Sequence, residues 1–195
     1  SPFPYTHFGC ECGARIVFML RENLFNSFLM GGFECSTHRG RRGRRLDLIE
    51  STRHAEFAVS DYERLTNIGI KTARDGVRWH LIEKKPFVYD FSSLEQQLRA
   101  MRESGLQIIW DLFHYGFPDL DIFSPEFVER FAGFSAATAS FLKSQTEGPL
   151  FICPVNEISF FSWAAGDAGA FYPYAKKRGN ELKRQLVRTT IASID

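Results

Sequence analysis

The sequence has few cysteines and no long apolar run. It contains four cysteines in 195 residues, and none has the C-x-x-C spacing that is typical of zinc sites and redox motifs. No apolar stretch approaches the ~20 residues that span a membrane. The segment IVFML, residues 16–20, is too short for the apolar core of a signal peptide. We therefore expect a cytoplasmic protein that does not contact membranes.

The cysteines and histidines are also poor candidates for a metal site. Cys10-x-Cys12 is a weak pattern by itself, and Cys35 and Cys153 stand near predicted strand ends, where we interpret them as small apolar core residues. No metal-ligand spacing relates the histidines outside the predicted site, His7, His38, His54 and His80. We expect neither a metal ion nor a cofactor.

Neither sign of charge is in excess. The chain has 24 Lys and Arg against 23 Asp and Glu, a net charge of +1, so no global field attracts nucleic acid. The local exception is the run HRGRRGRR, residues 38–45. No aromatic residue interleaves this run, although stacking rings are common in surfaces that bind single-stranded nucleic acid. We interpret it as a solvated loop at the rim of a pocket, with a phosphorylated sugar as the alternative ligand.

Phenylalanine, in contrast, is abundant, with 20 residues. Hydrophobic residues make up 44% of the chain and charged residues 24%, as in a globular domain. Phenylalanine rings suit a thick core and also offer flat faces on which a ligand stacks, and composition does not separate these uses. We divide the chain into an irregular leader, residues 1–25, and one α/β unit, residues 26–195.

From residue 26 onward, short apolar segments alternate with segments of helical spacing. The apolar segments predict strands at 27–33, 70–77, 106–113 and 150–155. Helices are predicted at 60–69, 92–105 and 124–141, with a fourth starting near Asn180. The first two begin with the capping-box patterns Ser60-x-x-Glu63 and Ser92-x-x-Glu95, and the third begins with Ser124-Pro125.

This alternation predicts parallel strands joined by right-handed crossovers, the α/β class. Neither G-x-G-x-x-G nor G-x-x-x-x-G-K-[ST] follows a strand, so a doubly wound nucleotide-binding fold is not favoured. Each strand instead ends on ionisable or hydrogen-bonding residues, as the strands of a barrel do at the face where catalytic loops meet. We predict a (β/α)8 TIM-barrel type with only the first four β/α units present, a half barrel. The polar strand ends are Glu34 with His38, Arg74 with Asp75, Asp111 with His114, and Asn156 with Glu157.

Four segments resemble glycoside hydrolase family 1, the β-glucosidase-like enzymes of the retaining barrel glycosidase clan. VNEISFFSW, residues 155–163, is similar to the Asn-Glu segment at the end of strand 4 in that family. GIKTARDGVRW, residues 69–79, resembles its strand 2, and LFHYGFPD, residues 112–119, resembles the end of its strand 3. FLMGG, residues 28–32, resembles strand 1. The motifs occur in the right order across residues 26–180.

The resemblance implies hydrolysis of a β-glycoside by two carboxyl groups about 5 to 5.5 Å apart. Glu157 would be the general acid/base, Asn156 would bind the sugar 2-hydroxyl, and His114 would bind another hydroxyl. Arg74 would hold the nucleophilic carboxylate. Trp163, together with Phe171 and Tyr172, would form an apolar platform for a ring of the substrate.

The chain also departs from the family. The nucleophile is a Glu at the end of strand 7 there, so it would lie beyond Asp195, and we expect this chain to be the N-terminal half of a barrel and inactive alone. Ile158 stands where many members have Pro. Glu34 and His38 are the nearest candidates where the family has a sugar-binding Gln.

Two alternatives remain open. A sugar-binding barrel that has lost hydrolysis would keep the same pocket, and an unrelated barrel enzyme acting on phosphate esters would need a catalytic Lys or a metal cluster at the strand ends. Asp75 and Asp111 are interpreted as partners of arginines or as loop caps, outside the site. The sequence predicts neither the sugar and its linkage nor the oligomeric state.

Overall fold

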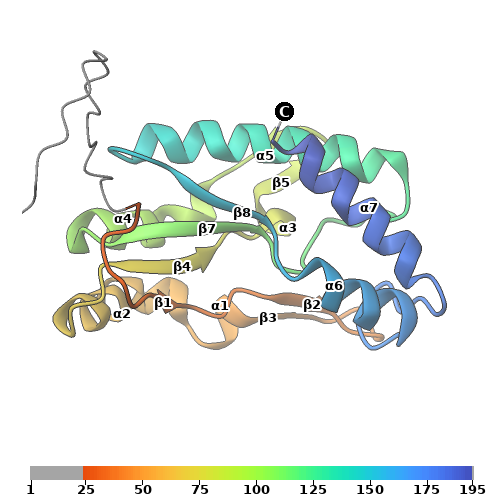
Figure 1. Ribbon diagram of the computed structural model, residues 1–195, viewed down its shortest axis with the longest axis horizontal. Helices are drawn as coiled ribbons and strands as arrows, with labels where there is room; N and C mark the ends of the chain where they lie inside the picture. Colours follow the sequence, from red (N-terminus) through yellow and green to blue (C-terminus); the bar gives the residue numbers. More distant parts are fainter. Residues whose placement is uncertain (1–23, 195) are drawn as a thin grey trace, which may run out of the picture.

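The centre of the molecule is a four-stranded parallel sheet, seen in a computed structural model that describes residues 24–194 (Figure 1). Its strands are β1 (Gly31–Gly32), β4 (Thr72–Gly76), β7 (Gln107–Phe113) and β8 (Phe151–Val155), in the order β1-β4-β7-β8. The predicted alternation of parallel strands and helices is confirmed. Cys10, Cys12, the IVFML segment and all but two residues of the predicted leader lie outside the described residues.

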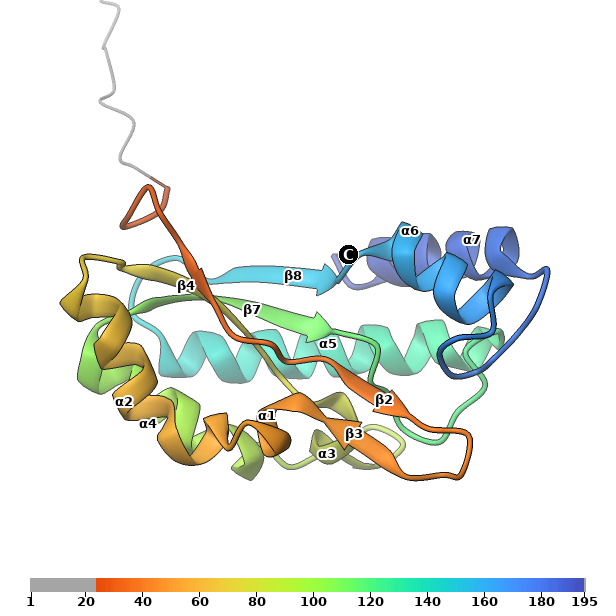
Figure 2. The ribbon, with the colours of Figure 1, turned by 90° about the horizontal axis from the view of Figure 1, so that it is seen from below.

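Long helices follow the strands and pack along the sheet. They are α2 (His54–Asn67), α4 (Glu95–Ser104), α5 (Pro125–Gln145) and α7 (Gly179–Ala192). Helix α2 packs against α4, and α5 packs against α7. Figure 2 shows α2, α4 and α5 on one side of strands β4, β7 and β8. None of the helices in residues 24–194 is long and apolar enough to cross a bilayer.

Side chains alternate between the two faces of the sheet, as the two-residue period of a strand requires. Ala73, Ile108 and Trp110 are buried on the helix side. Ile109 and Phe151, which are in register with each other on β7 and β8, are only partly buried. The helix side is therefore the core, and the opposite face is the open face of the half barrel.

Three phenylalanines of helix α5 lie at the centre of that core. Phe127, Phe131 and Phe134 of α5 are fully buried around the indole of Trp79, with ring centroids 5.4, 5.2 and 5.3 Å from it. Burying an aromatic side chain of this size contributes about 2 to 3 kcal/mol to folding. These three phenylalanines therefore serve the core and not ligand stacking.

Helix α5 begins where the sequence predicts. Ser124 is the N-cap, its hydroxyl accepts a hydrogen bond from the Phe127 amide at 3.2 Å, and Pro125 occupies the first turn. Gly105 ends α4 with a positive φ of 66°, a conformation that glycine adopts readily.

The two predicted capping boxes are wrong. Helix α2 begins at His54, six residues before Ser60, and the Ser60 hydroxyl donates to the Phe57 carbonyl inside the helix. Tertiary contacts extend it, because His54 Nε2 and the Tyr62 hydroxyl both bond Asp75 on β4, at 2.9 and 2.6 Å.

At the second box, a 3-10 turn, η1 (Ser92–Leu94), precedes α4. The carboxylate of Asp90 caps that turn by accepting from the Ser92 amide at 2.9 Å, so Ser92 does not act as the cap.

The first strand is much shorter than predicted. Only Gly31 and Gly32 pair with β4, opposite Ala73 and Arg74. Ser27 contacts the sheet through its hydroxyl, which accepts from the Lys71 amide at 2.9 Å, and not through a strand ladder. A Cβ on Gly31 would lie 2.6 Å from a methyl group of Leu65, so this strand passes closer to α2 than a larger residue allows.

The arginine-rich run is not an open loop. It forms an antiparallel hairpin of β2 (Thr37–Arg39) and β3 (Arg45–Asp47), which the sequence analysis did not predict. The remaining short elements are α1 (Leu48–Ser51), α3 (Trp79–Ile82), β5 (Glu83–Lys85), β6 (Val88–Tyr89), α6 (Ile158–Phe161) and the π-helix η2 (Ser162–Asp167).

Candidate active site

Polar side chains from three strands meet at the carboxyl end of the sheet. Arg74 of β4 donates from Nη2 to Asn156 Oδ1 at 2.5 Å. The Asn156 amide nitrogen lies 2.9 Å from His114 Nε2 and 3.2 Å from the Tyr115 hydroxyl. The Tyr115 hydroxyl donates to Glu157 Oε2 at 2.6 Å. We call these five residues the strand-end network.

The structure therefore brings together Arg74, His114, Asn156 and Glu157, four residues that the sequence analysis proposed for the site. It adds Tyr115, to which the sequence analysis gave no role. The ring of Tyr115 is stacked on Phe161 at 4.9 Å, which fixes the direction of its hydroxyl. The sequence signal for this residue was its position directly after His114 at a strand end.

The hydrogen bonds of the network have a fixed direction. A guanidinium group only donates, so the atom of Asn156 that faces Arg74 is the carbonyl oxygen. The amide nitrogen of Asn156 must then donate to His114 Nε2, which places the proton of a neutral His114 ring on Nδ1. Asn156 also donates to Tyr115, whose own proton goes to the Glu157 carboxylate.

Two members of the network have strained backbones. Tyr115 has a φ of 70° and Glu157 a φ of 44°, both in the left-handed region that non-glycine residues seldom adopt. Each such residue costs on the order of 1 kcal/mol, and strain of this kind gathers at functional sites. The two strained residues, Tyr115 and Glu157, are also the two that are joined by a hydrogen bond.

Asp111 contacts two members of the network, Arg74 and His114. Its Oδ1 accepts from Arg74 Nη2 at 2.6 Å, and the residue is 1% exposed. Burial alone would raise the pKa of Asp111, but hydrogen bonds from His114, Arg74 and Cys153 outweigh it and lower the pKa. The interpretation of Asp111 as the partner of an arginine is correct. Its position within reach of His114 was not predicted.

Asp75 is not part of this site. Its side chain points to the helix side of the sheet, where His54 and Tyr62 bond it. It is completely buried. Asp75 therefore anchors α2 on the sheet, and its partner is a histidine and a tyrosine instead of the arginine that the sequence suggested.

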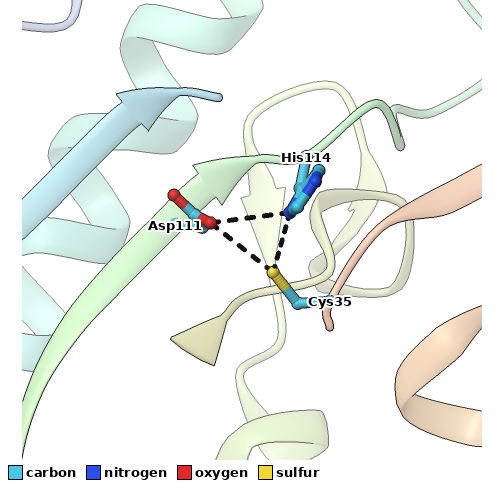
Figure 3. A group of neighbouring side chains, drawn as sticks. All are labelled: Cys35, Asp111 and His114. Atoms are coloured by element: carbon cyan, nitrogen blue, oxygen red, sulfur yellow. Dashed lines mark hydrogen bonds and ion pairs between the residues drawn. The ribbon is translucent and has the colours of Figure 1, made fainter. Parts of the chain in front are cut away.

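Cys35, Asp111 and His114 lie together in a group with the spacing of metal ligands (Figure 3). The three pairs of atoms are separated by 3.1 Å (Cys35 Sγ to His114 Nδ1), 3.5 Å (His114 Nδ1 to Asp111 Oδ2) and 3.6 Å (Cys35 Sγ to Asp111 Oδ2). Ligands about 2.0 to 2.3 Å from a tetrahedral zinc ion would have similar separations. Sequence spacing did not reveal this group, because its members come from distant parts of the chain.

Proton positions in this group nevertheless favour hydrogen bonds over a metal ion. His114 Nδ1 carries the proton in the tautomer that Asn156 imposes, and a protonated nitrogen is not a ligand. Burial, followed by the charges of Asp111, Asp75 and Glu34, raises the pKa of the Cys35 thiol far above its usual range, and the thiol donates to Asp111 Oδ2 at 3.6 Å. We interpret the group as a hydrogen-bonded support for His114.

Glu34 and His38 each lie next to a member of the strand-end network. Glu34 Oε1 is 3.8 Å from His114 Nε2 and accepts from the Ser36 amide at 2.9 Å. Burial tends to raise the pKa of Glu34, but hydrogen bonds from Ser36 are the main cause that lowers it. The ring of His38 packs 5.7 Å from Tyr115 and 4.3 Å from Phe171. These were the two candidates for the sugar-binding Gln position.

The predicted aromatic platform is not a single surface. Trp163 is 57% exposed in η2, and its nearest ring is Phe160 at 6.0 Å, so it lies outside the strand-end network. Phe171 lies beside Tyr115, with a centroid distance of 5.8 Å. Tyr172 packs instead against Phe117 at 5.5 Å. Phe171 is thus close to the network, whereas the ring of Phe160 lies between Trp163 and Tyr115.

Comparison with known proteins identifies the fold. No protein-family model matches the sequence, and no curated protein matches it. Among solved structures, a rice Os3BGlu6 β-glucosidase is similar with a TM-score of 0.70 and 12% identity, covering 86% of this chain and 44% of its own. The family 1 β-glucosidase of Thermotoga maritima is similar with a TM-score of 0.64 and 16% identity, covering 72% of this chain and 34% of its own.

The AHE enzyme of Alicyclobacillus herbarius is similar to the same extent, with a TM-score of 0.65 and 14% identity over 72% of this chain and 34% of its own. The chain thus spans between a third and a half of the length of these neighbours. The predicted fold class is confirmed. The chain has the fold of part of a (β/α)8 barrel, the barrel of the family 1 β-glucosidases.

Proposed function

We propose that the strand-end network is the acid/base and sugar-binding part of a retaining β-glycosidase site. The observation that carries this proposal is the junction of Asn156 and Glu157, at the end of β8, with His114 and Tyr115, at the end of β7. Chemistry in barrel enzymes takes place at this end of the strands. The proposal draws further support from structural neighbours that are β-glucosidases.

In this proposal Glu157 is the general acid/base. Tyr115 holds Oε2, which leaves Oε1 to protonate the departing glycosidic oxygen and later to take a proton from water. The Asn156 amide, whose carbonyl is held by Arg74, presents its NH₂ to the sugar 2-hydroxyl. The Nε2 lone pair of His114 accepts from a second hydroxyl when the sugar displaces the Asn156 contact.

Arg74 has a role in holding the second carboxylate. Its Nη2 is engaged with Asp111 and Asn156, while its Nε is buried without a hydrogen-bond partner in residues 24–194. A buried donor of this kind is costly unless it is paired, and a nucleophilic carboxylate is a suitable acceptor. We propose that this carboxylate is not supplied by residues 24–194, and that the chain alone does not complete the reaction.

The ligand in this proposal is a β-glucoside-like carbohydrate. The Thermotoga maritima β-glucosidase has been solved with deoxynojirimycin and with substituted glucoimidazoles. The rice Os3BGlu6 β-glucosidase mutant forms a covalent complex with Glc. These are properties of the neighbours. For this chain they suggest a sugar ring as the first ligand to test.

A calorimetric titration of the purified chain with a glucoimidazole tests the proposal. The imidazole nitrogen lies where the glycosidic oxygen would be, so it should take a hydrogen bond from Glu157. We expect measurable binding that Glu157→Gln and Asn156→Ala each weaken by about tenfold or more. Glu147→Gln, a carboxylate at the opposite end of the sheet, is the matched control and should bind as the unmodified chain does.

Absence of binding by the unmodified chain, or equal binding by Glu157→Gln, would contradict the site assignment. An aryl β-glucoside gives the second readout. We expect no turnover of it by this chain, and steady turnover would show that residues of this chain supply both carboxylates.

A further inference from the structure

The arginine-rich hairpin and the segment 170–174 line an open surface cavity of about 530 Å³. His38, Arg39 and Arg45 line it from the hairpin strands, and Arg44 lines it from the turn. Ala170, Phe171 and Tyr174 form the opposite wall. We call this space the hairpin cavity. The interpretation of the run as a solvated loop is therefore incomplete, since three of its arginines converge on one space.

The positive charge around the cavity is only partly compensated. Arg45 donates to neutral acceptors, the Phe117 carbonyl at 3.0 Å and the Thr37 hydroxyl at 3.4 Å. Burial and the charge of Arg39 lower the pKa of Arg45. Arg44 makes no side-chain hydrogen bond or ion pair within the part of the chain that the structure describes.

The charges of Asp47 and Asp119 act on Arg45, but neither residue lines the cavity. Arg39 pairs with Asp119 at 2.6 Å, but the Asp119 side chain is 84% exposed and does not line the cavity. A pair so open to water is screened and contributes little. No Asp or Glu belongs to the lining. The cavity therefore favours an anion.

The hairpin is held firmly against the opposite wall. Arg41 donates to the Gly169 carbonyl at 2.6 Å, and its guanidinium lies 4.2 Å from the ring centroid of Tyr174. The Tyr174 hydroxyl donates in turn to the Arg39 carbonyl at 2.6 Å. These contacts preform the cavity, so a ligand would not have to order it.

The hairpin cavity also adjoins the strand-end network. Two of its lining rings, His38 and Phe171, lie 5.7 and 5.8 Å from the ring of Tyr115. Tyr115 is the residue that donates to Glu157. A ligand that occupies the cavity can thus extend toward the strand ends, with aromatic walls along the way.

We propose that the hairpin cavity binds the anionic group, a carboxylate or a phosphate, of a ligand that also carries a flat ring. Arg44 and Arg45 contact the anion, because guanidinium groups match the geometry of both anions. Phe171 and Tyr174 contact the ring. The link to a carbohydrate at the strand ends rests on the proposed function. Anion binding itself does not.

Phenyl phosphate and benzoate are suitable probes, with benzyl alcohol as the neutral control. In calorimetric titrations of the chain at low salt, we expect at least one of the anions to bind about tenfold or more tightly than benzyl alcohol. The tighter of the two identifies the anion, and added salt should weaken its binding.

Three variants locate the binding. Arg45→Gln and Arg44→Gln should each weaken the binding of the anion by about tenfold. Arg44 is exposed and without partners among residues 24–194, so its replacement should not disturb folding, whereas Arg45 is half-buried. Arg42→Gln, in the same turn but outside the lining, is the matched control and should have no effect beyond a small loss of long-range attraction.

Equal affinity for benzyl alcohol and the anions, or unchanged anion binding in both lining variants, would overturn the proposal. Glucoimidazole binding without anion binding would refute the cavity proposal and leave the proposed function intact. Anion binding without glucoimidazole binding would refute the proposed function and leave the cavity proposal intact.

Discussion

Arg74 Nη2 and Asn156 Oδ1 lie 2.5 Å apart across β7, the strand that separates their own strands. This one bond orients the Asn156 amide, since a guanidinium can only donate. The orientation then determines what the amide nitrogen offers to His114, to Tyr115 and to an incoming hydroxyl. Arg74 thus determines which atoms donate and which accept throughout the strand-end network, although Arg74 itself need not contact the glycosidic bond.

The tautomer of His114 is the first testable consequence. We expect the neutral ring to carry its proton on Nδ1, because Nε2 accepts from Asn156. ¹⁵N-detected NMR of the imidazole nitrogens distinguishes the two tautomers. Asn156→Ala should release the constraint and give a mixture. A proton found on Nε2 in the unmodified chain would contradict the deduced direction of the network.

Replacing Arg74 should reduce stability. Arg74→Gln removes the cation that pairs with Asp111, a carboxylate that is almost fully buried. Removing one partner of a buried pair costs 3–5 kcal/mol, and because the Arg74 side chain is 40% exposed we expect a smaller loss, about 2 kcal/mol. Denaturant unfolding measures it. The double variant Arg74→Gln/Asp111→Asn should recover part of the loss, and no recovery would argue against this ion pair.

Two tyrosine-to-carboxylate hydrogen bonds allow an effect on ligand binding to be distinguished from an effect on stability. Tyr115 and Tyr62 each donate to a carboxylate at 2.6 Å, Tyr115 to Glu157 and Tyr62 to the buried Asp75. Tyr115→Phe should weaken glucoimidazole binding several-fold and lower the free energy of unfolding by only about 1 kcal/mol. Tyr62→Phe should show the opposite pattern, with unchanged binding and a larger loss of stability, because it removes one of the hydrogen bonds that stabilise a completely buried carboxylate. Identical behaviour of the two variants would remove Tyr115 from the site.

Stability should also depend on the protonation of His54. Burial lowers the pKa of His54, but the hydrogen bonds and charges of Asp75 and Asp61 outweigh it and raise the pKa above 6.5. A raised pKa in the folded state means that this contribution is complete below pH 6.5 and is lost as the pH rises through the folded value. We expect the free energy of unfolding to fall over that range by at most about 1.4 kcal/mol per pH unit. In His54→Gln this pH dependence should be absent, and its persistence would assign it to another group.

Phe134 and Phe28 form a matched pair, one in the core and one exposed. Phe134 is fully buried and stacked on Trp79, whereas Phe28 is 98% exposed. Phe134→Ala should cost about 3–5 kcal/mol in unfolding free energy, because it removes apolar contacts and leaves a cavity. Phe28→Ala should change it by less than about 0.5 kcal/mol. Similar losses in the two variants would mean that the ring of Phe28 is covered in the folded chain.

The order of the main elements and the chemistry of the strand ends could be predicted from the sequence. Strands β7 and β8 are largely apolar segments followed by polar residues, and β4 carries Arg74 and Asp75 near its end. Their parallel arrangement follows from the helices between them. The start of α5 was predicted because Ser124 and Pro125 act locally. Arg74 and Asn156 could be proposed together because parallel strands bring their carboxyl ends to one edge.

Features that depend on tertiary contacts could not be predicted in this way. Helix α2 begins at His54 because Asp75 anchors that residue across the core. The hairpin of β2 and β3 is held by contacts between Arg41 and the distant segment 169–174. Trp163 is exposed and lies in the π-helix η2, which no local pattern indicated.

A crystal structure of the chain with a glucoimidazole would test the central claim most directly. The account predicts the sugar ring at the carboxyl ends of β4, β7 and β8, with the imidazole nitrogen hydrogen-bonded to Glu157 and a ring hydroxyl bonded to the Asn156 amide. A ligand bound elsewhere on the chain, with Glu157 and Asn156 unchanged and without contact to it, would contradict the account.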